Sequence, residues 1–556
     1  MYKVQSSENG GRNMKRSVWM RVVCLMMAAC LMMVVGCDNS TSDPQPTFNF
    51  DENDGPLVPY EETVTITQVK SHNPNITYIE GESKDNNFVT EFYKEKLNVV
   101  WETVWDSDPA AYTAKLNLDI AADELPDVFL CNANQLQLLV ENGQIMDLTQ
   151  LYEFYGSDKL KANISEAALA SCTYDGKLFA IPQMTSGESD VSIMWLRTDW
   201  MRQLGLEAPT TYDELVAYVK AIKDSGLAGS SCGLNFYGPG SQTFAAIAHT
   251  QGAYYDTWIE KENGEVVYSG VQPEMRNALL KMQEMYKAGL IDEDFAIKGS
   301  TEEALIAQGT YGVVFGQYFY GHLIKGSVLN DQNAEWRCFP IPADMNGSIK
   351  PKSSLNVGGY YVVNIDCENP EALLKSMNLW MEVWTQEGQY RDWFTDEMLN
   401  EHADVYLCGE YALPSFFDVV DNNVKIGVAI RDAYSSADPD ETIKNYPFAR
   451  LTYNLMKDES NFYKFVAGEG WALKHVYLYA EDVYDDYEQF QYNAFNGVLS
   501  EDAAFLKTTI DSIMIETYYN IIMGEDISAF DAMVEQWYEL GGEQITEEVN
   551  AWVKSH

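Results

Sequence analysis

The sequence predicts an α/β fold in two units, and three observations lead to this prediction. The chain has 556 residues, enough for two or more domains that each bury a core. Hydrophobic residues make up 46% of it and aromatic residues 13%, which argues against a mainly disordered chain. Segments with strand-like alternation also take turns with segments of helical periodicity in both halves of the body.

The first half of the body predicts a parallel sheet. We expect strands at residues 63–67, 99–104 and 126–130, and helices between them at about 87–96 and 109–122. In the first strand, Val64 and Ile66 fall on one face. A β-α-β-α-β order implies parallel strands with right-handed crossovers, and ligands collect beyond the carboxyl ends of such strands.

The second half is again mixed. Thr211 and Glu214 predict a capping box at the start of a helix, and residues 233–236 predict a strand. Pro370 predicts the first turn of another helix, and a last helix over 528–540 ends at two glycines. Two α/β units of this size imply two lobes.

The amino terminus predicts export. Basic residues precede an uncharged apolar run over 22–35, which is shorter than the ~20 residues that span a membrane and suits a signal peptide. The run ends in Gly36-Cys37, which resembles a bacterial lipobox in which the cysteine is lipidated. We therefore expect a signal peptide over 1–36, a lipid anchor on Cys37, and a polar, proline-containing tether over 37–60.

Composition and motifs exclude several classes of function. The net charge of −47 argues against nucleic acid as a partner, because phosphate contacts need Lys or Arg. The sequence GSSCG at 229–233 matches a nucleophile elbow literally, but a predicted helix precedes it and a strand follows, the reverse of the required order. No zinc or nucleotide-binding motif occurs, and the acidic runs at 51–55 and 292–294 favour solvated loops over calcium sites. We expect no catalytic residue, metal or cofactor.

Six cysteines follow Cys37, and their wide spacing in apolar stretches favours buried free thiols over disulfides. They are Cys131, Cys172, Cys232, Cys338, Cys367 and Cys408.

Aromatic content indicates carbohydrate as a ligand. The chain has 13 Trp and 35 Tyr, whose flat apolar faces suit the C–H face of a sugar ring. Most of these residues are expected in the core, including Trp195, Trp200, Trp380 and Trp384. Gln317, Tyr318 and Tyr320 instead follow a predicted strand at 311–315 and are candidates for contact with a ligand.

Several stretches in one order resemble the bacterial extracellular solute-binding proteins for carbohydrates, over about residues 61–556. They are LPDVF at 125–129, YDGKLFAIP at 174–182, WLRTDWMRQLGL at 195–206 and APTTYDEL at 208–215. The tail, with IIMG at 521–524 and two glycines at 541–542, resembles the large lipoprotein subgroup often called LplA-like or LipO-like.

The resemblance implies a two-lobe "Venus flytrap" that feeds an ABC importer, each lobe having a mixed, mostly parallel sheet. Residues 61–182 and 356–408 would form the N-lobe, and residues 183–355 and 409–556 the C-lobe. The implied partners are a carbohydrate ligand and the permease subunits. We expect a monomer on the outer face of the cytoplasmic membrane, held there only by its lipid.

The resemblance also implies ligand contacts at positions that match cleft loops of the family. They are Asn132, Asn134 and Gln135 after the first-lobe strand, Glu188 at the crossing between lobes, Gln242, Asn356 on the return strand, and Trp471 as a stacking platform.

Two alternatives stay open. The same scaffold would suit an exported carbohydrate-active enzyme, which would change its ligand chemically. It would also suit a carrier of a peptide or another small solute. Few basic residues fall near the expected cleft, but Arg197 and Lys352 leave acidic sugars open.

Overall fold

The computed structural model divides the chain into residues 1–47 and 48–556, and the second unit carries the fold. It describes residues 45–555 except 73–77, 79, 186–190, 299–301, 354, 386–387, 394–421, 445, 458, 468–469, 481–482, 485–486 and 488. The predictions for the signal peptide, Cys37, Glu188 and Cys408 lie outside the described residues.

A five-stranded sheet organises the N-lobe, the name we use for the part of the chain packed around this sheet. Its strands lie in the order β2-β1-β3-β13-β6. They are β1 (Val64–Ser71), β2 (Val99–Ser107), β3 (Val128–Cys131), β6 (Ile181–Met184) and β13 (Val357–Val363). The pairs β1–β2 and β1–β3 are parallel, as the β-α-β-α-β order predicts, whereas β13 runs antiparallel to β3 and β6.

The helices between these strands begin and end at residues that satisfy the backbone. α2 (Phe88–Leu97) starts at a capping box between Asn87 and Thr90. α3 (Pro109–Ala122) has Pro at its first position and Asp108 as its cap, and it ends at Asp123 in a left-handed conformation (φ 56°). Both helices agree with the predicted ranges.

The segment expected to be a tether up to residue 60 is partly folded. Phe48, Phe50, Leu57 and Tyr60 pack against the N-lobe core. Residues 48–60 therefore belong to the N-lobe, and the expected boundary is too late because their aromatic and aliphatic side chains find a buried surface.

A three-stranded sheet organises the C-lobe, the part of the chain packed around β10 (Val313–Gly316), β7 (Ile193–Arg197) and β11 (Trp336–Phe339) in that order. Both pairings are antiparallel, so this sheet differs from the mostly parallel one that was expected. The predicted strand at 233–236 contributes only a single parallel bridge, Leu234 to Val313.

Buried strand β7 separates two cores. Ile193 and Trp195 pack into one cluster, and Met194 and Leu196 into the other, as the alternation of a strand requires. Trp195 and Trp200 are buried as expected, and so is Trp380 in the N-lobe, while Trp384 is partly buried there.

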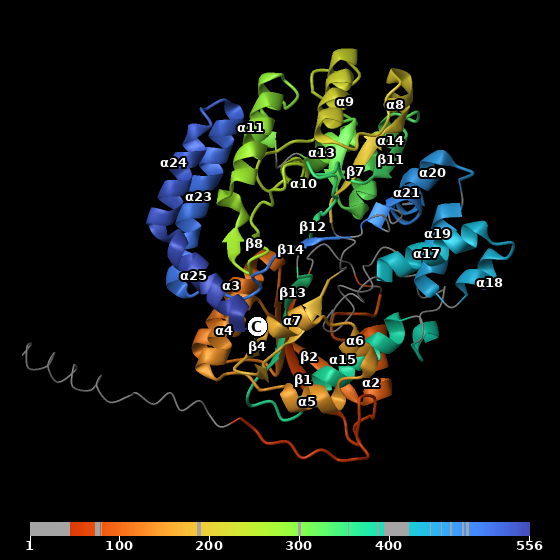
Figure 1. Ribbon diagram of the computed structural model, residues 1–556. Helices are drawn as coiled ribbons and strands as arrows, with labels where there is room; N and C mark the ends of the chain where they lie inside the picture. Colours follow the sequence, from red (N-terminus) through yellow and green to blue (C-terminus); the bar gives the residue numbers. More distant parts are fainter. Residues whose placement is uncertain are drawn as a thin grey trace, which may run out of the picture. The chain divides into compact units, whose positions relative to one another are not determined.

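Helices from distant parts of the chain cover the C-lobe. α11 (Pro273–Lys287) packs against α23 (Glu501–Met523), which packs against α24 (Ser528–Trp537), and Figure 1 shows the three side by side. The expected end of the last helix at the glycines appears as an interruption at Gly541 (φ 119°), after which α25 (Glu543–Ser555) continues.

The helices not yet named are α4 (Ala133–Asn142), α5 (Thr149–Tyr155), α6 (Asp158–Ala162), α7 (Glu166–Ala170), α8 (Thr198–Leu204), α9 (Tyr212–Ser225), α10 (Gln242–His249), α12 (Phe295–Lys298), α13 (Glu302–Gln308), α14 (Gly321–Asn330), α15 (Glu371–Trp384), α17 (Asn422–Ser435), α18 (Pro439–Ile443), α19 (Pro447–Lys457), α20 (Phe462–Ala467) and α21 (Gly470–His475). Short strand pairs are β4 (Thr173–Tyr174) with β5 (Lys177–Leu178), β8 (Trp258–Glu260) with β9 (Val266–Tyr268), and β12 (Lys352–Ser353) with β14 (Gln491–Tyr492). Within the described ranges, no helix is both long and apolar enough to cross a bilayer.

The cysteines agree with the prediction as far as they are described. Cys131, Cys172, Cys232 and Cys367 are buried, Cys338 is partly buried, and all five are free thiols.

Candidate functional site

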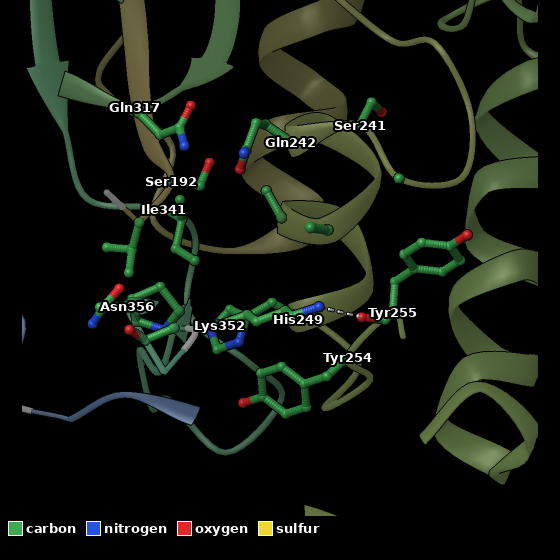
Figure 2. Close-up of a pocket in the computed structure, with 16 residues that line it drawn as sticks. Ser192, Ser241, Gln242, His249, Tyr254, Tyr255, Gln317, Ile341, Lys352 and Asn356 are labelled. Carbon is green, nitrogen blue, oxygen red and sulfur yellow. Dashed lines mark hydrogen bonds between the residues drawn. The ribbon is translucent and has the colours of Figure 1, made fainter. Parts of the chain in front are cut away.

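A pocket of about 320 Å³ is lined in part by the segments that lead into β7 and β13, and Figure 2 shows its lining. Its volume is at the lower end of the roughly 300–1,000 Å³ typical of small-molecule sites. The described lining comes from five places in the chain: residues 191–192, eight residues within 240–255, the single residues Gln317 and Ile341, and four residues within 351–356. The polar residues among them are Ser192, Ser241, Gln242, His249, Tyr254, Tyr255, Gln317, Lys352, Ser353 and Asn356.

Ser192 is placed by two tyrosines from the chain after residue 480. Tyr487 donates its hydroxyl hydrogen to the Ser192 carbonyl (3.0 Å) and accepts from the Ile341 amide (3.1 Å). Tyr484 acts in the same way between the Val191 carbonyl (3.0 Å) and the Tyr318 amide (3.0 Å). This part of the chain therefore fixes one wall of the pocket.

The Ser192 hydroxyl is buried and has no hydrogen-bond partner among the described residues. The residue is 8% exposed and lines the pocket. Leaving a buried hydroxyl without a hydrogen-bond partner costs about 1–3 kcal/mol of stability. A ligand atom that bonded to this hydroxyl would recover that cost.

Gln242 faces the pocket from the first turn of α10. The preceding Ser241 caps this helix by accepting the Phe244 amide (3.2 Å). The side-chain amide of Gln242 is therefore not needed to cap the helix.

Gln317 enters the pocket from the end of β10. Its carbonyl accepts the indole N–H of Trp195 (3.3 Å), which holds the backbone in place. The preceding Gly316 lies against the ring of Tyr320, where an added Cβ would be 2.1 Å from a ring carbon. The close approach of the Tyr320 ring therefore requires glycine at 316, the last residue of the strand.

Asn356 stands where the chain returns toward the N-lobe sheet. Its backbone is left-handed (φ 58°), which Asn tolerates better than most residues. Its carbonyl accepts the Thr185 amide (2.8 Å), so the two crossing segments are joined at this point.

His249 forms an inner part of the lining from the end of α10. It is 2% exposed, and its Nε2 accepts the Lys350 amide (3.4 Å). Burial lowers the pKa of His249 to about 4, so the ring is neutral at physiological pH. It offers the pocket an uncharged polar ring tilted against Tyr254.

Three residues predicted from the sequence line this pocket: Gln242, Gln317 and Asn356. The pocket lining among the described residues does not include Asn132, Asn134 or Gln135. Asn132 and Gln135 form the capping box of α4, and the Gln135 side chain also donates to Asn117 (2.7 Å). Asn134 is exposed on the same helix.

The predicted aromatic contacts lie in the C-lobe core instead. Trp471 is 7% exposed, and its ring stacks on His475 at 3.7 Å. Tyr320 is buried against Gly316, and Tyr318 is partly buried against the same cluster. None of the three is among the lining residues of the pocket.

The remaining motifs have structural roles. The Ser231 hydroxyl donates to Asp292 (2.9 Å), which also pairs with Lys298 (3.0 Å), so the GSSCG turn and the second acidic run stabilise each other. In the first acidic run, Asp54 pairs with Lys375. Across the described part of the chain, no group of three or more His, Cys, Asp or Glu is placed to hold a metal ion.

Sequence reasoning did not nominate Ser192, His249, Tyr254 or Tyr255 for the site. His249 has no local motif, and Ser192 directly precedes an apolar strand. One signal could have found Ser192: it lies shortly after Glu188, where the family resemblance places the crossing between the lobes.

Comparisons with known proteins agree on one family. A family model described as bacterial extracellular solute-binding protein matches residues 77–382. Lipoprotein LipO of Bacillus subtilis is 21% identical over 479 residues, which cover 83% of this chain and 87% of LipO. The fructooligosaccharide ABC transporter substrate-binding protein FusA of Streptococcus pneumoniae is 21% identical over 342 residues, 58% of this chain and 61% of FusA.

Solved structures share the fold. FusA of S. pneumoniae in complex with kestose aligns with a TM-score of 0.58 at 15% identity, covering 88% of this chain and 99% of FusA. The alginate-binding protein AlgQ2 without calcium ion aligns with a TM-score of 0.57 at 16% identity, covering 90% and 100%. An HMO-binding solute-binding protein of Bifidobacterium longum infantis has the same TM-score of 0.57 at 17% identity, covering 88% of this chain and 98% of that protein. These neighbours confirm the two-lobe α/β class.

Proposed function

The chain belongs to the bacterial extracellular solute-binding proteins, and from that premise we propose that it captures an oligosaccharide or sugar derivative for an ABC importer. The relatives support the ligand class, since FusA is named for fructooligosaccharides and its solved complex holds kestose. The lining supports it as well, because a sugar presents hydroxyl groups in several directions.

One observation carries the proposal more than any other. The Ser192 hydroxyl is buried in the pocket without a partner from the described residues, and the amides of Gln242 and Gln317 line the same space. Hydroxyl and amide groups both donate and accept, which matches a sugar hydroxyl. Asn356, His249 and Tyr254 complete the contacts that we propose.

Capture would proceed by closure of the two lobes. The lining includes both crossing segments, at residues 191–192 and 351–356, so a ligand there would touch the chain that connects the lobes. Ligand contacts that form only in the closed state would shift the population toward it. The closed form would then be the one that the permease subunits recognise.

The binding role is tested with purified protein and a panel of neutral and acidic oligosaccharides. A bound ligand at 100 times its Kd stabilises the fold by about 2.7 kcal/mol, which raises the melting temperature. Gln242→Ala and Gln317→Ala should each weaken binding roughly three- to tenfold. Gln137→Ala is the matched control, because Gln137 pairs with Glu141 on the outside of α4.

The alternative of an enzyme predicts a different outcome for the same panel. Recovery of unchanged ligand after incubation supports the carrier, whereas new reducing ends would replace the proposal with a glycoside-cleaving enzyme. Stabilisation by peptides but by no sugar would move the proposal to another solute.

We also propose that Cys37 carries a lipid that holds the protein at the outer face of the cytoplasmic membrane. The apolar run and Gly36-Cys37 support this, as does the lipoprotein relative LipO. Cys37→Ser should release the protein into the medium, and its retention in the membrane fraction would refute the anchor.

A further inference from the structure

The charge of the pocket lining is opposite to that of the chain. Acidic residues outnumber basic ones by 84 to 37 in the sequence. Among the described residues that line the pocket, there is no Asp or Glu, and one residue, Lys352, is a cation. The neighbouring His249 is neutral, as shown above. The described lining therefore carries one positive charge.

The Lys352 ammonium is held in place by backbone carbonyls. It donates to the carbonyl oxygens of Tyr255 (2.9 Å) and Asp256 (3.0 Å), and Figure 2 shows the first of these bonds. Within the described part of the chain, no carboxylate oxygen lies within 4.0 Å of it. An ammonium has three donors, so two are used by neutral groups and one is left for a ligand.

The carboxylate of Asp256, whose own carbonyl binds Lys352, forms hydrogen bonds to other residues. Asp256 accepts from the Tyr268 hydroxyl (3.0 Å) and from Lys507 (3.3 Å), and Lys507 also pairs with Asp511 (2.6 Å). The backbone of Asp256 is left-handed (φ 47°), and the carbonyls of Tyr255 and Asp256 both accept from Lys352. The positive charge is thus positioned by hydrogen bonds to a segment that Tyr268 and Lys507 also hold.

The ammonium also lacks part of its hydration. Lys352 as a residue is exposed, but its ammonium lies against protein, and this desolvation lowers the pKa of the group. The charge of Asp256 raises the same pKa and that of Lys507 lowers it, so the two nearest charges act in opposite directions. A desolvated cation with no carboxylate in direct contact among the described residues gains when an anion binds beside it.

We propose that the pocket recognises an acidic sugar, whose carboxylate pairs with Lys352 while Ser192, Gln242 and Gln317 bind its hydroxyl groups. This inference rests on the proposed carbohydrate ligand and narrows it to a uronic acid residue. Lys352 acts here as a binding residue, and the Asp256 network positions it.

The test compares sugars that differ only in the carboxylate. Oligogalacturonides and oligoglucuronides of two to four units are titrated into the whole protein beside their carboxyl-reduced, neutral forms. Because a charge-assisted hydrogen bond is about twice as strong as a neutral one, the acidic form should bind roughly 10- to 100-fold more tightly. Lys352→Met should remove this preference, and Lys352→Arg should keep part of it.

Lys350→Met is the matched control, because it removes a lysine two residues away whose side chain does not line the pocket. It should keep the full preference. Melting curves confirm that each variant is folded.

Equal affinity for acidic and neutral forms would overturn the inference, and so would a preference that survives in Lys352→Met. Binding of neutral sugars alone would overturn the acidic ligand and leave the proposed function standing. Failure of every sugar to bind the wild-type protein would overturn both.

Discussion

The two lobes use polar residues at their strand ends in different ways. After β3 in the N-lobe, Asn132 and Gln135 close a capping box at the start of α4. In the C-lobe, Gln317 after β10 and Gln242 at the start of α10 line the pocket. The same side-chain chemistry therefore supports a helix in one lobe and lines a pocket in the other.

The two cases differ in which residue accepts the hydrogen bonds of the free amides at the start of the helix. The first amides of a helix need acceptors, and an Asn directly before a helix supplies one. At α10 the hydroxyl of Ser241 takes this role, which leaves Gln242 available. A polar residue near a strand end is thus a better site candidate when its neighbour already caps the helix.

The largest expected effect is a loss of stability in the N-lobe that leaves binding at the pocket unchanged. Lys375 is almost fully buried in α15, where it pairs with Asp54 and donates to the Val58 carbonyl (2.7 Å). Lys375→Met removes the only cation paired with Asp54 among the described residues, leaving the carboxylate its hydrogen bonds from Tyr155 and Gly55, and should lower the free energy of unfolding by about 3 kcal/mol. Urea unfolding measures this loss, while sugar affinity in the folded protein should not change.

The double variant Lys375→Met with Asp54→Asn should recover part of that loss, because it removes the unpaired charge. A loss of sugar affinity in the folded single variant would show that the N-lobe anchor and the pocket are coupled, and the contrast between the lobes would fail.

Acid should weaken the C-lobe. Burial lowers the pKa of His249 to about 4 and that of His475 to about 3. Each binds fewer protons when folded than when unfolded, so its contribution to stability is complete above about pH 6.5 and falls as the pH drops toward the folded pKa. For His249 the loss should approach roughly 3 kcal/mol.

Urea unfolding at a series of pH values between 7 and 4 measures this slope. His249→Gln should flatten it, because the substitution removes the buried group whose pKa burial lowers. An unchanged slope in His249→Gln would contradict the assignment.

The N-lobe was the more predictable half because its contacts are local in sequence. Three strands and two helices in succession, from residue 63 to residue 130, build most of its sheet, and α3 begins and ends at the predicted residues. The C-lobe brings strand β7 together with β10, more than 100 residues later, and with tyrosines after residue 480. Hydrophobic periodicity carries no information on which distant segments meet.

The site was predictable only where an element boundary marked it. Gln317 and Asn356 follow or precede recognisable strands, and both line the pocket. Trp471 fits a stacking platform by residue type, but its ring stacks on His475 in the core. Residue type alone does not separate a core aromatic from one in a cleft, because both bury the same apolar face.

Removing a partnerless hydroxyl in the C-lobe should affect binding without weakening the fold. Ser192 has no hydrogen-bond partner for its hydroxyl among the described residues, so Ser192→Ala loses no bond of the free protein. The free energy of unfolding should stay the same or rise slightly, while sugar affinity should fall roughly three- to tenfold. Calorimetric titration and urea unfolding give the two values. Equal affinity in wild type and Ser192→Ala would remove Ser192 from the site.

The smallest expected effect concerns a polar residue that follows a strand in the N-lobe. Asn132 accepts the Gln135 amide (3.0 Å) at the start of α4, so Asn132→Ala should lower the free energy of unfolding by about 1 kcal/mol. Asn132→Ser should restore most of it, because Ser also caps helices. Sugar affinity should match wild type in both variants. If Asn132→Ala weakened binding without changing the free energy of unfolding, Asn132 would be a ligand contact and the end of β3 would belong to the ligand site. Loss of a helix cap would instead lower stability first.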